Sequence, residues 1–126
     1  MPGKWRLAIT QDFSASHQLR NYGGKCEQMH GHNFGVEVVV EGADLDEKVQ
    51  YLMDFKALKR LTKEVLDKLD HHHLNEVECF TEINPSSENL AMFIYRQVKP
   101  RLPENVRLVE VSVSEKPSSK ATYWEE

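Results

Sequence analysis

The strongest constraint on the fold of this chain is the alternation of side chains over residues 30–41, "HGHNFGVEVVVE". Successive side chains of a β-strand point to opposite faces of a sheet, so every second residue shares a face. One face of this segment carries valine, phenylalanine and histidine, whereas Glu37 and Glu41 lie on the other. The pattern predicts a strand that buries one of its faces. The residues of that face are His30, His32, Phe34, Val36, Val38 and Val40.

A second strand is predicted over residues 5–17, where the alternation has one polar exception at Gln11. Residues 18–29 are rich in turn-forming residues and predict the loop that joins the two strands. The strands would then pair antiparallel. The residues on the apolar side of the first strand are Leu7, Ile9, Phe13, Ala15 and His17.

Two helices are predicted in the middle of the chain. Residues 53–70 carry apolar side chains at helical spacing, with charged side chains on the opposite face. Residues 84–98 predict the second helix, with Ser86 or Ser87 as its N-cap and Glu88 in its first turn.

The C-terminal part returns to strand patterns at residues 106–115 and 120–124. The expected order is therefore β-β-α-α-β-β, an α+β fold with an antiparallel sheet and both helices on one of its faces. Such a sheet has two open edges, which must be covered, charged or paired. We therefore expect an oligomer whose sheets continue from one subunit to the next. The residues expected on one face of the third strand are Val109, Val111, Val113 and Glu115.

Length and charge limit the class of protein. The 126 residues fit one domain, residues 1–126, and the net charge of −4 with scattered Lys and Arg argues against nucleic-acid or anionic-membrane partners. No apolar stretch approaches a membrane span, and the N-terminus has no apolar signal region, so we expect a cytoplasmic protein. Thiols stay reduced there, so Cys26 and Cys79 are interpreted as free, with Cys79 a buried or incidental apolar side chain.

Three histidines are expected to converge at one end of the paired strands. His30 and His32 project to the same side, and the antiparallel partner brings His17 opposite them. Zinc accepts three imidazole ligands and leaves a fourth position open for water or substrate. The alternative is that these are ordinary polar residues near strand ends. The spacing favours a zinc site.

Cys26 and the pair Asp70–His71 leave two interpretations open. Cys26 is either a fourth zinc ligand that closes a structural site or a free thiolate that acts on substrate, and Lys25 beside it favours the charged form. Asp70 and His71 are either a solvated helix end or a carboxylate that orients a proton-transferring imidazole.

Six segments, in this order, resemble the 6-pyruvoyl-tetrahydropterin synthase family over nearly the whole chain. They are "FSASH", "KCEQMHGHNF", "MDFKALK", "LDHHHLN", "NPSSENLA" and "SEKPSSKATY". The tail "EKPSSKATY" is most similar to the bacterial 6-carboxy-tetrahydropterin synthase branch.

The resemblance implies a tunnelling fold whose subunits assemble into barrels, often as hexamers built from two trimers with sites at subunit interfaces. It implies zinc as the cofactor and a lyase of queuosine biosynthesis that acts on 7,8-dihydroneopterin triphosphate. By resemblance the zinc ligands are His17, His30 and His32, the catalytic residues are Cys26, Asp70 and His71, and the substrate-binding residues are Ser86, Ser87, Glu88 and Glu115.

Two positions depart from the family pattern. Many relatives have Arg where this chain has Gln18, so Arg20 or Lys25 is a candidate cation for the triphosphate. Lys116 replaces the usual Thr after Glu115 and is either an added phosphate contact or a solvated side chain.

Three alternatives to the carboxy-forming reaction stay open. One is the 6-pyruvoyl activity on the same substrate, and another is a family member that shortens the dihydroneopterin side chain. Members of the latter kind tend to have Glu in place of the cysteine, so Cys26 counts against it. The third is a non-catalytic zinc-binding assembly module with Cys26 as a ligand.

Overall fold

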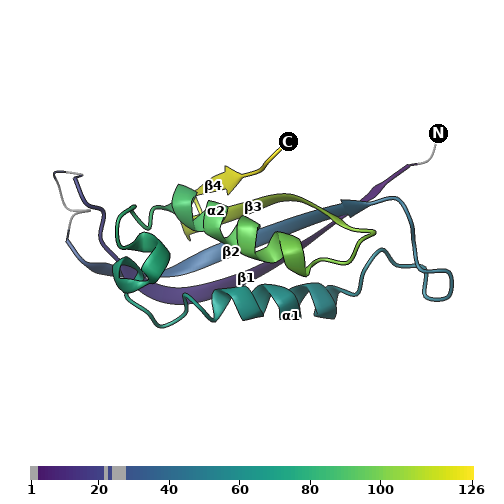
Figure 1. Ribbon diagram of the computed structural model, residues 1–126, viewed down its shortest axis with the longest axis horizontal. Coiled ribbons are helices and arrows are strands. Elements are labelled where there is room, and N and C mark those ends of the chain that lie inside the picture. The colour runs from purple at the N-terminus through teal and green to yellow at the C-terminus, as the bar shows by residue number, and fades with distance from the viewer. Residues whose placement is uncertain (1–2, 22, 24–27) are drawn as a thin grey trace.

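The computed structural model describes residues 3–21, Gly23 and residues 28–126. One antiparallel sheet forms a layer in the order β1-β2-β3-β4, and two helices lie on one face of it (Figure 1). The strands are β1 (Trp5–His17), β2 (His30–Gly42), β3 (Arg107–Lys116) and β4 (Ser119–Tyr123), and the helices are α1 (Phe55–Leu66) and α2 (Ser87–Val98). The predicted α+β class and the order of strands and α-helices are confirmed. Short 3₁₀ segments that the sequence patterns did not predict are added, namely η2 (Leu74–Glu76), η3 (Glu78–Phe80) and η4 (Lys99–Arg101).

The long β1–β2 hairpin sets the position of the histidines. Its register places His17 opposite His30 and Ala15 opposite His32, so the predicted antiparallel pairing is confirmed. Phe13 and Phe34 stack at 5.0 Å between ring centroids on the same face. That face packs against the helices and forms the core, which explains why its alternating residues are apolar.

Helix α1 is shorter than the predicted range 53–70. It begins after Asp54, whose carboxylate accepts a hydrogen bond from the Lys56 N–H at 2.8 Å. After α1 ends, the chain turns to run beside the outer edge of β1. There the His71 N–H donates to the Ser14 carbonyl at 2.6 Å, which covers part of that edge.

The prediction that Val109 shares a face with Val111 and Val113 is wrong. The register shifts between Val39, opposite Glu110, and Val40, opposite Leu108, so Val109 is an additional residue on β3. A β-bulge of this kind changes which residues face the core. Leu108, which is 3% exposed, takes the core position instead.

Two further observations concern the expectations from composition. Cys79 is exposed, which excludes the buried one of the two options given for it. Within residues 3–21, Gly23 and 28–126, no helix is both long enough and apolar enough to cross a membrane.

Candidate metal centre and adjoining cleft

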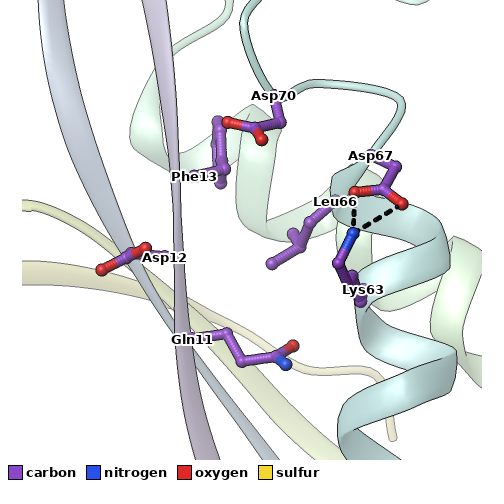
Figure 2. A pocket seen from close by; sticks show the side chains of 7 residues that line it. All are labelled: Gln11, Asp12, Phe13, Lys63, Leu66, Asp67 and Asp70. Carbon is purple, nitrogen blue, oxygen red and sulfur yellow. Dashed lines mark hydrogen bonds and ion pairs between the residues drawn. The ribbon is translucent and has the colours of Figure 1, made fainter.

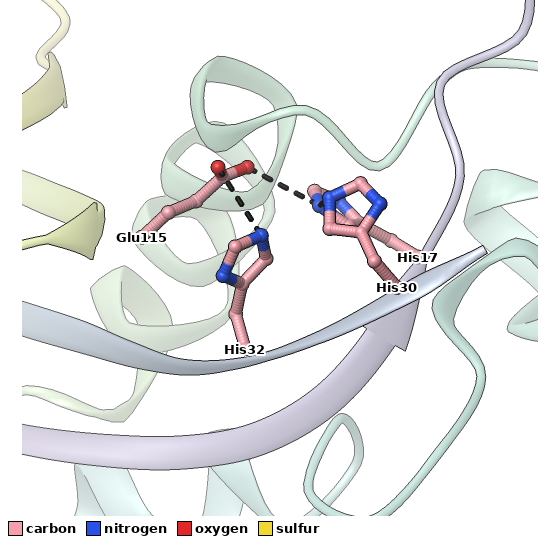
Figure 3. Close-up of side chains that lie close together, drawn as sticks. All are labelled: His17, His30, His32 and Glu115. Carbon is pink, nitrogen blue, oxygen red and sulfur yellow. Dashed lines mark hydrogen bonds and ion pairs between the residues drawn. The ribbon is translucent and has the colours of Figure 1, made fainter. Parts of the chain in front are cut away.

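Four side chains from three strands meet at one end of the sheet (Figure 3). His17 ends β1, His30 and His32 open β2, and Glu115 lies near the end of β3. His17 Nε2 lies 3.1 Å from His30 Nε2 and 3.2 Å from Glu115 Oε1, while His32 Nε2 lies 3.4 Å from Glu115 Oε2. One ligand atom from each residue lies within 4.8 Å of all the others.

The hydrogen bonds behind the rings turn their free nitrogens toward one another. His17 Nδ1 donates to the Pro85 carbonyl and His30 Nδ1 donates to the Gln28 carbonyl, each at 2.8 Å. A neutral ring that donates from Nδ1 has its lone pair on Nε2. The two Nε2 atoms therefore present lone pairs to each other at 3.1 Å, an arrangement that a shared cation would stabilise.

The burial of His17 favours its neutral form, which is the form that binds a metal. His17 is fully buried, and the loss of hydration lowers its pKa, against the opposing effects of the Pro85 hydrogen bond and the Glu115 carboxylate. Apart from the 3.4 Å contact with Glu115 Oε2, the buried His32 Nε2 has no hydrogen-bond partner among the described residues. A buried polar atom without a hydrogen bond is costly, so it is expected to meet a ligand.

Three contacts in the cluster have nearly the length expected between ligands of one tetrahedral ion. Zinc binds His nitrogen and carboxylate oxygen at about 2.0–2.2 Å, which places neighbouring ligand atoms about 3.3–3.6 Å apart. The three short separations in the cluster are 3.1, 3.2 and 3.4 Å. The residues present therefore fit a metal ion. The strand register predicted the meeting of the histidines, whereas the approach of Glu115 to the cluster was not predicted.

A cleft of about 280 Å³ opens beside the cluster, with Glu115 as their common member. Ser86 is the N-cap of α2, since its Oγ accepts a hydrogen bond from the Asn89 N–H at 3.1 Å. It also lines the cleft, so its two roles are compatible. The lining residues are Leu19, Ser86, Ser87, Glu88, Glu115, Ser119, Lys120 and Ala121.

Asp70 and His71 form a pair away from the cluster, at the outer edge of β1. His71 Nδ1 lies 3.0 Å from Asp70 Oδ2, and Asp70 Oδ1 accepts from the Ser14 N–H at 2.9 Å. The Ser14 hydrogen bond and then His71 lower the pKa of Asp70, so the carboxylate stays charged. The His71 side chain is 82% exposed, and its φ of 60° is uncommon for a residue other than glycine.

The pocket between β1 and α1 extends to the same carboxylate (Figure 2). It has a volume of about 290 Å³, and Asp70 lies on its wall. Across it, Lys63 Nζ forms an ion pair with Asp67 at 2.8 Å. Gln11, the polar exception in β1, donates from Nε2 to the Lys59 carbonyl at 3.2 Å, which accounts for a polar residue on this side.

The remaining candidates are three cationic side chains and Cys26. Arg20 is held by main-chain carbonyls, with donation from its guanidinium to Phe80 at 2.8 Å and to Ile83 at 3.0 Å. These bonds disfavour the expectation that it contacts phosphate. Lys116 is exposed. Cys26 and Lys25 lie outside the described residues.

The fold and the cluster define a small α+β domain with a candidate metal centre beside a cleft of about 280 Å³. The chain belongs to the 6-pyruvoyl tetrahydropterin synthase family, whose sequence model matches residues 6–126. Several 6-carboxy-5,6,7,8-tetrahydropterin synthases are among its relatives.

Three similar proteins have names that give three different activities. The dihydroneopterin monophosphate aldolase of Pyrococcus furiosus is 37% identical over 112 residues, 89% of this chain and 90% of the relative. The 6-carboxy-5,6,7,8-tetrahydropterin synthase of Bacillus subtilis is 32% identical over 130 residues, 97% of this chain and 86% of the relative. The structure of Caenorhabditis elegans 6-pyruvoyl tetrahydropterin synthase matches with a TM-score of 0.86 and 27% identity, over 98% of this chain and 97% of that one. The chain is accordingly an enzyme of pterin metabolism.

Proposed function

We propose that the protein is a zinc-dependent 6-carboxy-tetrahydropterin synthase of queuosine biosynthesis. It converts 7,8-dihydroneopterin triphosphate and one water to 6-carboxy-5,6,7,8-tetrahydropterin, acetaldehyde and triphosphate. The observation that carries this proposal is the cluster of His17, His30, His32 and Glu115 at the mouth of a cleft. The tail pattern "EKPSSKATY" favours the carboxy-forming branch.

The histidines would hold the ion. Zinc, when bound, polarises the side-chain hydroxyls of the substrate and makes them more acidic. The chain contributes by fixing the rings of His17 and His30 through the Pro85 and Gln28 carbonyls, which keeps Nε2 directed at the centre.

The cleft would bind the pterin ring. A pterin presents neighbouring N–H donors along one edge, and a carboxylate with two oxygens accepts both. Glu115 is the candidate for this contact, supported by Ser86, Ser87 and Glu88 along the same wall. Lys25 remains the candidate cation for the triphosphate.

Proton transfer is assigned to Cys26 and to the pair Asp70–His71. Asp70 is held by the Ser14 N–H and in turn orients the His71 ring, which is the arrangement a proton-transferring imidazole needs. The high exposure of His71 at the outer edge of β1 favours a role in a site completed by a second subunit.

Assembly follows from the sheet edges. β1 and β4 are the two outer strands. β4, and the part of β1 that the segment after α1 does not cover, offer main-chain groups that another subunit could pair with. We infer a homo-oligomer, a trimer or a hexamer, whose active sites lie between subunits.

A second candidate is cleavage of the dihydroneopterin side chain by an aldolase. The Pyrococcus furiosus relative with that name, at 37% identity, favours it. Cys26 counts against it, because family members of that kind tend to have Glu at this position.

Mass spectrometry of the products tests the proposal. Zinc-loaded enzyme is incubated with 7,8-dihydroneopterin triphosphate, and the same enzyme stripped of metal serves as the control. We expect 6-carboxy-tetrahydropterin with an equal amount of acetaldehyde. A pyruvoyl product alone, or a pterin with a shortened side chain from the mono- or triphosphate, would replace this assignment by the corresponding family activity. Bound zinc without any turnover would favour the non-catalytic module.

A further inference from the structure

Glu115 belongs to both the metal cluster and the cleft. Its side chain is 31% exposed and lies between the histidines on one side and the α2 N-terminus on the other. Both of its oxygens face the cluster, with Oε1 at 3.2 Å from His17 Nε2 and Oε2 at 3.4 Å from His32 Nε2 (Figure 3). Neither oxygen is therefore directed along the cleft in this conformation.

We propose that Glu115 is a fourth metal ligand while the cleft is empty and leaves the metal to anchor the pterin ring when the ring binds. This inference rests on the proposed function and deepens it, because ring binding would open a coordination position next to the substrate side chain.

The two roles exclude each other for a geometric reason. A contact to two neighbouring N–H groups needs both carboxylate oxygens aligned with the edge of the ring. In the observed conformation both oxygens instead face His17 and His32. The change from the metal-facing to the ring-binding conformation requires only rotation about the side-chain bonds of Glu115, which is fast for a partly exposed residue.

The distances support a ligand role over a simple ion pair. Glu115 approaches His17 through Oε1 at 3.2 Å and His32 through Oε2 at 3.4 Å, and His17 Nε2 lies 3.1 Å from His30 Nε2. Each of these contacts is close to the separation of about 3.3 Å between two ligands of one tetrahedral ion. An ion pair would explain the contacts of Glu115 with the histidines, but it leaves the two facing Nε2 atoms without a cation between them.

The first test measures metal binding with Co²⁺, whose visible absorption reports its ligands. Glu115→Gln keeps the size of the side chain and is compared with Glu110→Gln, which removes the same charge from the same strand. We expect Glu115→Gln to weaken Co²⁺ binding at least about tenfold, since even groups that only orient ligands contribute about 10- to 100-fold. Its absorption spectrum should also change, while Glu110→Gln should match the unmodified protein. Equal melting temperatures of the variants verify that both fold.

The second test uses the unmodified protein and 6-methylpterin, which has the ring but no side-chain hydroxyls to reach the metal. We expect 6-methylpterin to bind the metal-free protein more tightly than the Co²⁺-loaded protein. Its presence should weaken Co²⁺ binding by the same factor, because coupling between two sites is reciprocal. The Co²⁺ spectrum should then shift toward that of Glu115→Gln.

Two results would overturn the exchange. The first is that Glu115→Gln binds Co²⁺ with the same affinity and the same spectrum as the unmodified protein. The second is that 6-methylpterin does not bind, or binds equally tightly with and without Co²⁺. Neither would remove the proposed function if the unmodified enzyme forms 6-carboxy-tetrahydropterin. Absence of that product, with the exchange observed, would refute the function alone.

Discussion

His71 combines an uncommon backbone conformation with an exposed side chain that faces a charged carboxylate. The variant His71→Asn separates these features, because Asn tolerates positive φ but cannot transfer the proton. We expect kcat to fall about 10²- to 10⁴-fold, the usual contribution of general acid–base catalysis, with little change in melting temperature. Steady-state kinetics and thermal unfolding measure the two effects.

The matched control for this change is His72→Asn. His72 is the next residue and is also exposed, but its Nδ1 bonds to the Asp70 carbonyl and it is outside the proposed machinery. It should retain normal turnover. If both variants lose the same activity, the segment acts by its shape and His71 has no chemical role.

Replacement of Cys26 distinguishes a catalytic metal site from a structural one. The change Cys26→Ala should abolish turnover while leaving bound zinc and melting temperature unchanged, because the histidines and Glu115 already provide a full ligand set. Metal content is measured by atomic spectroscopy after dialysis. Loss of zinc together with a lower melting temperature would instead make the thiol a structural ligand.

At the scale of elements, the two helix N-caps provide a comparison. Asp54 caps α1 and Ser86 caps α2, but only Ser86 lines the cleft. Replacement of either by Ala should lower the free energy of unfolding by about 1 kcal/mol, measured by urea titration. Only Ser86→Ala should also raise KM. Equal KM values for the two variants would reduce Ser86 to a capping residue.

The elements predicted well from the sequence are those whose pattern is local. Alternation over residues 30–41 and its partner strand fixed the register of His17 against His30, and hence the meeting of the histidines. The bulge at Val109 was missed because an additional residue in β3 depends on its fit against β2, which no single-strand pattern contains.

The other differences between the predicted and the observed structure depend on contacts between residues that are far apart in the sequence. The segment after α1 lies beside β1 through hydrogen bonds between residues far apart in sequence, such as Asp70 with Ser14. The distance of Glu115 from the histidines depends likewise on how β3 pairs with β2 and on the conformation of one side chain. Its presence near the pterin was implied by family resemblance, whereas its contact with the metal ligands required the structure.

Across the whole molecule, charged networks predict acid sensitivity. Hydrogen bonds from Arg107 and Arg6 lower the pKa of Glu41 from its ordinary 4.5, so the folded state binds protons less readily than the unfolded chain. The stabilisation is complete above about pH 4.5 and is lost as pH falls through the lowered pKa. Melting temperature should therefore fall on acidification in this range, and less steeply in Glu41→Gln.

The control for acid sensitivity is Glu104→Gln, at an exposed position. The melting temperature of this variant should fall with pH as steeply as that of the unmodified protein. Salt at about 1 M should reduce the difference made by Glu41→Gln, because the screening length then falls to about 3 Å, comparable to the 2.9 and 3.1 Å that separate Glu41 from Arg107 and Arg6. If the melting temperature of Glu41→Gln falls with pH as steeply as that of the unmodified protein, other groups cause the acid sensitivity.

Assembly gives the prediction with the widest consequence. If Cys26 and His71 of one active site come from different subunits, two inactive variants can complement each other in a mixed oligomer. We expect Cys26→Ala and His71→Asn, each inactive alone, to recover about one quarter of normal activity when equal amounts are co-expressed, since random assembly in a symmetric oligomer pairs two intact contributions in about one site in four. Product formation per mole of mixed oligomer measures the recovery. The exposed position of His71 at the outer edge of β1 is the reason to expect it. Inactivity of the mixed oligomer, with mixing verified by mass spectrometry, would mean that each subunit builds its own site.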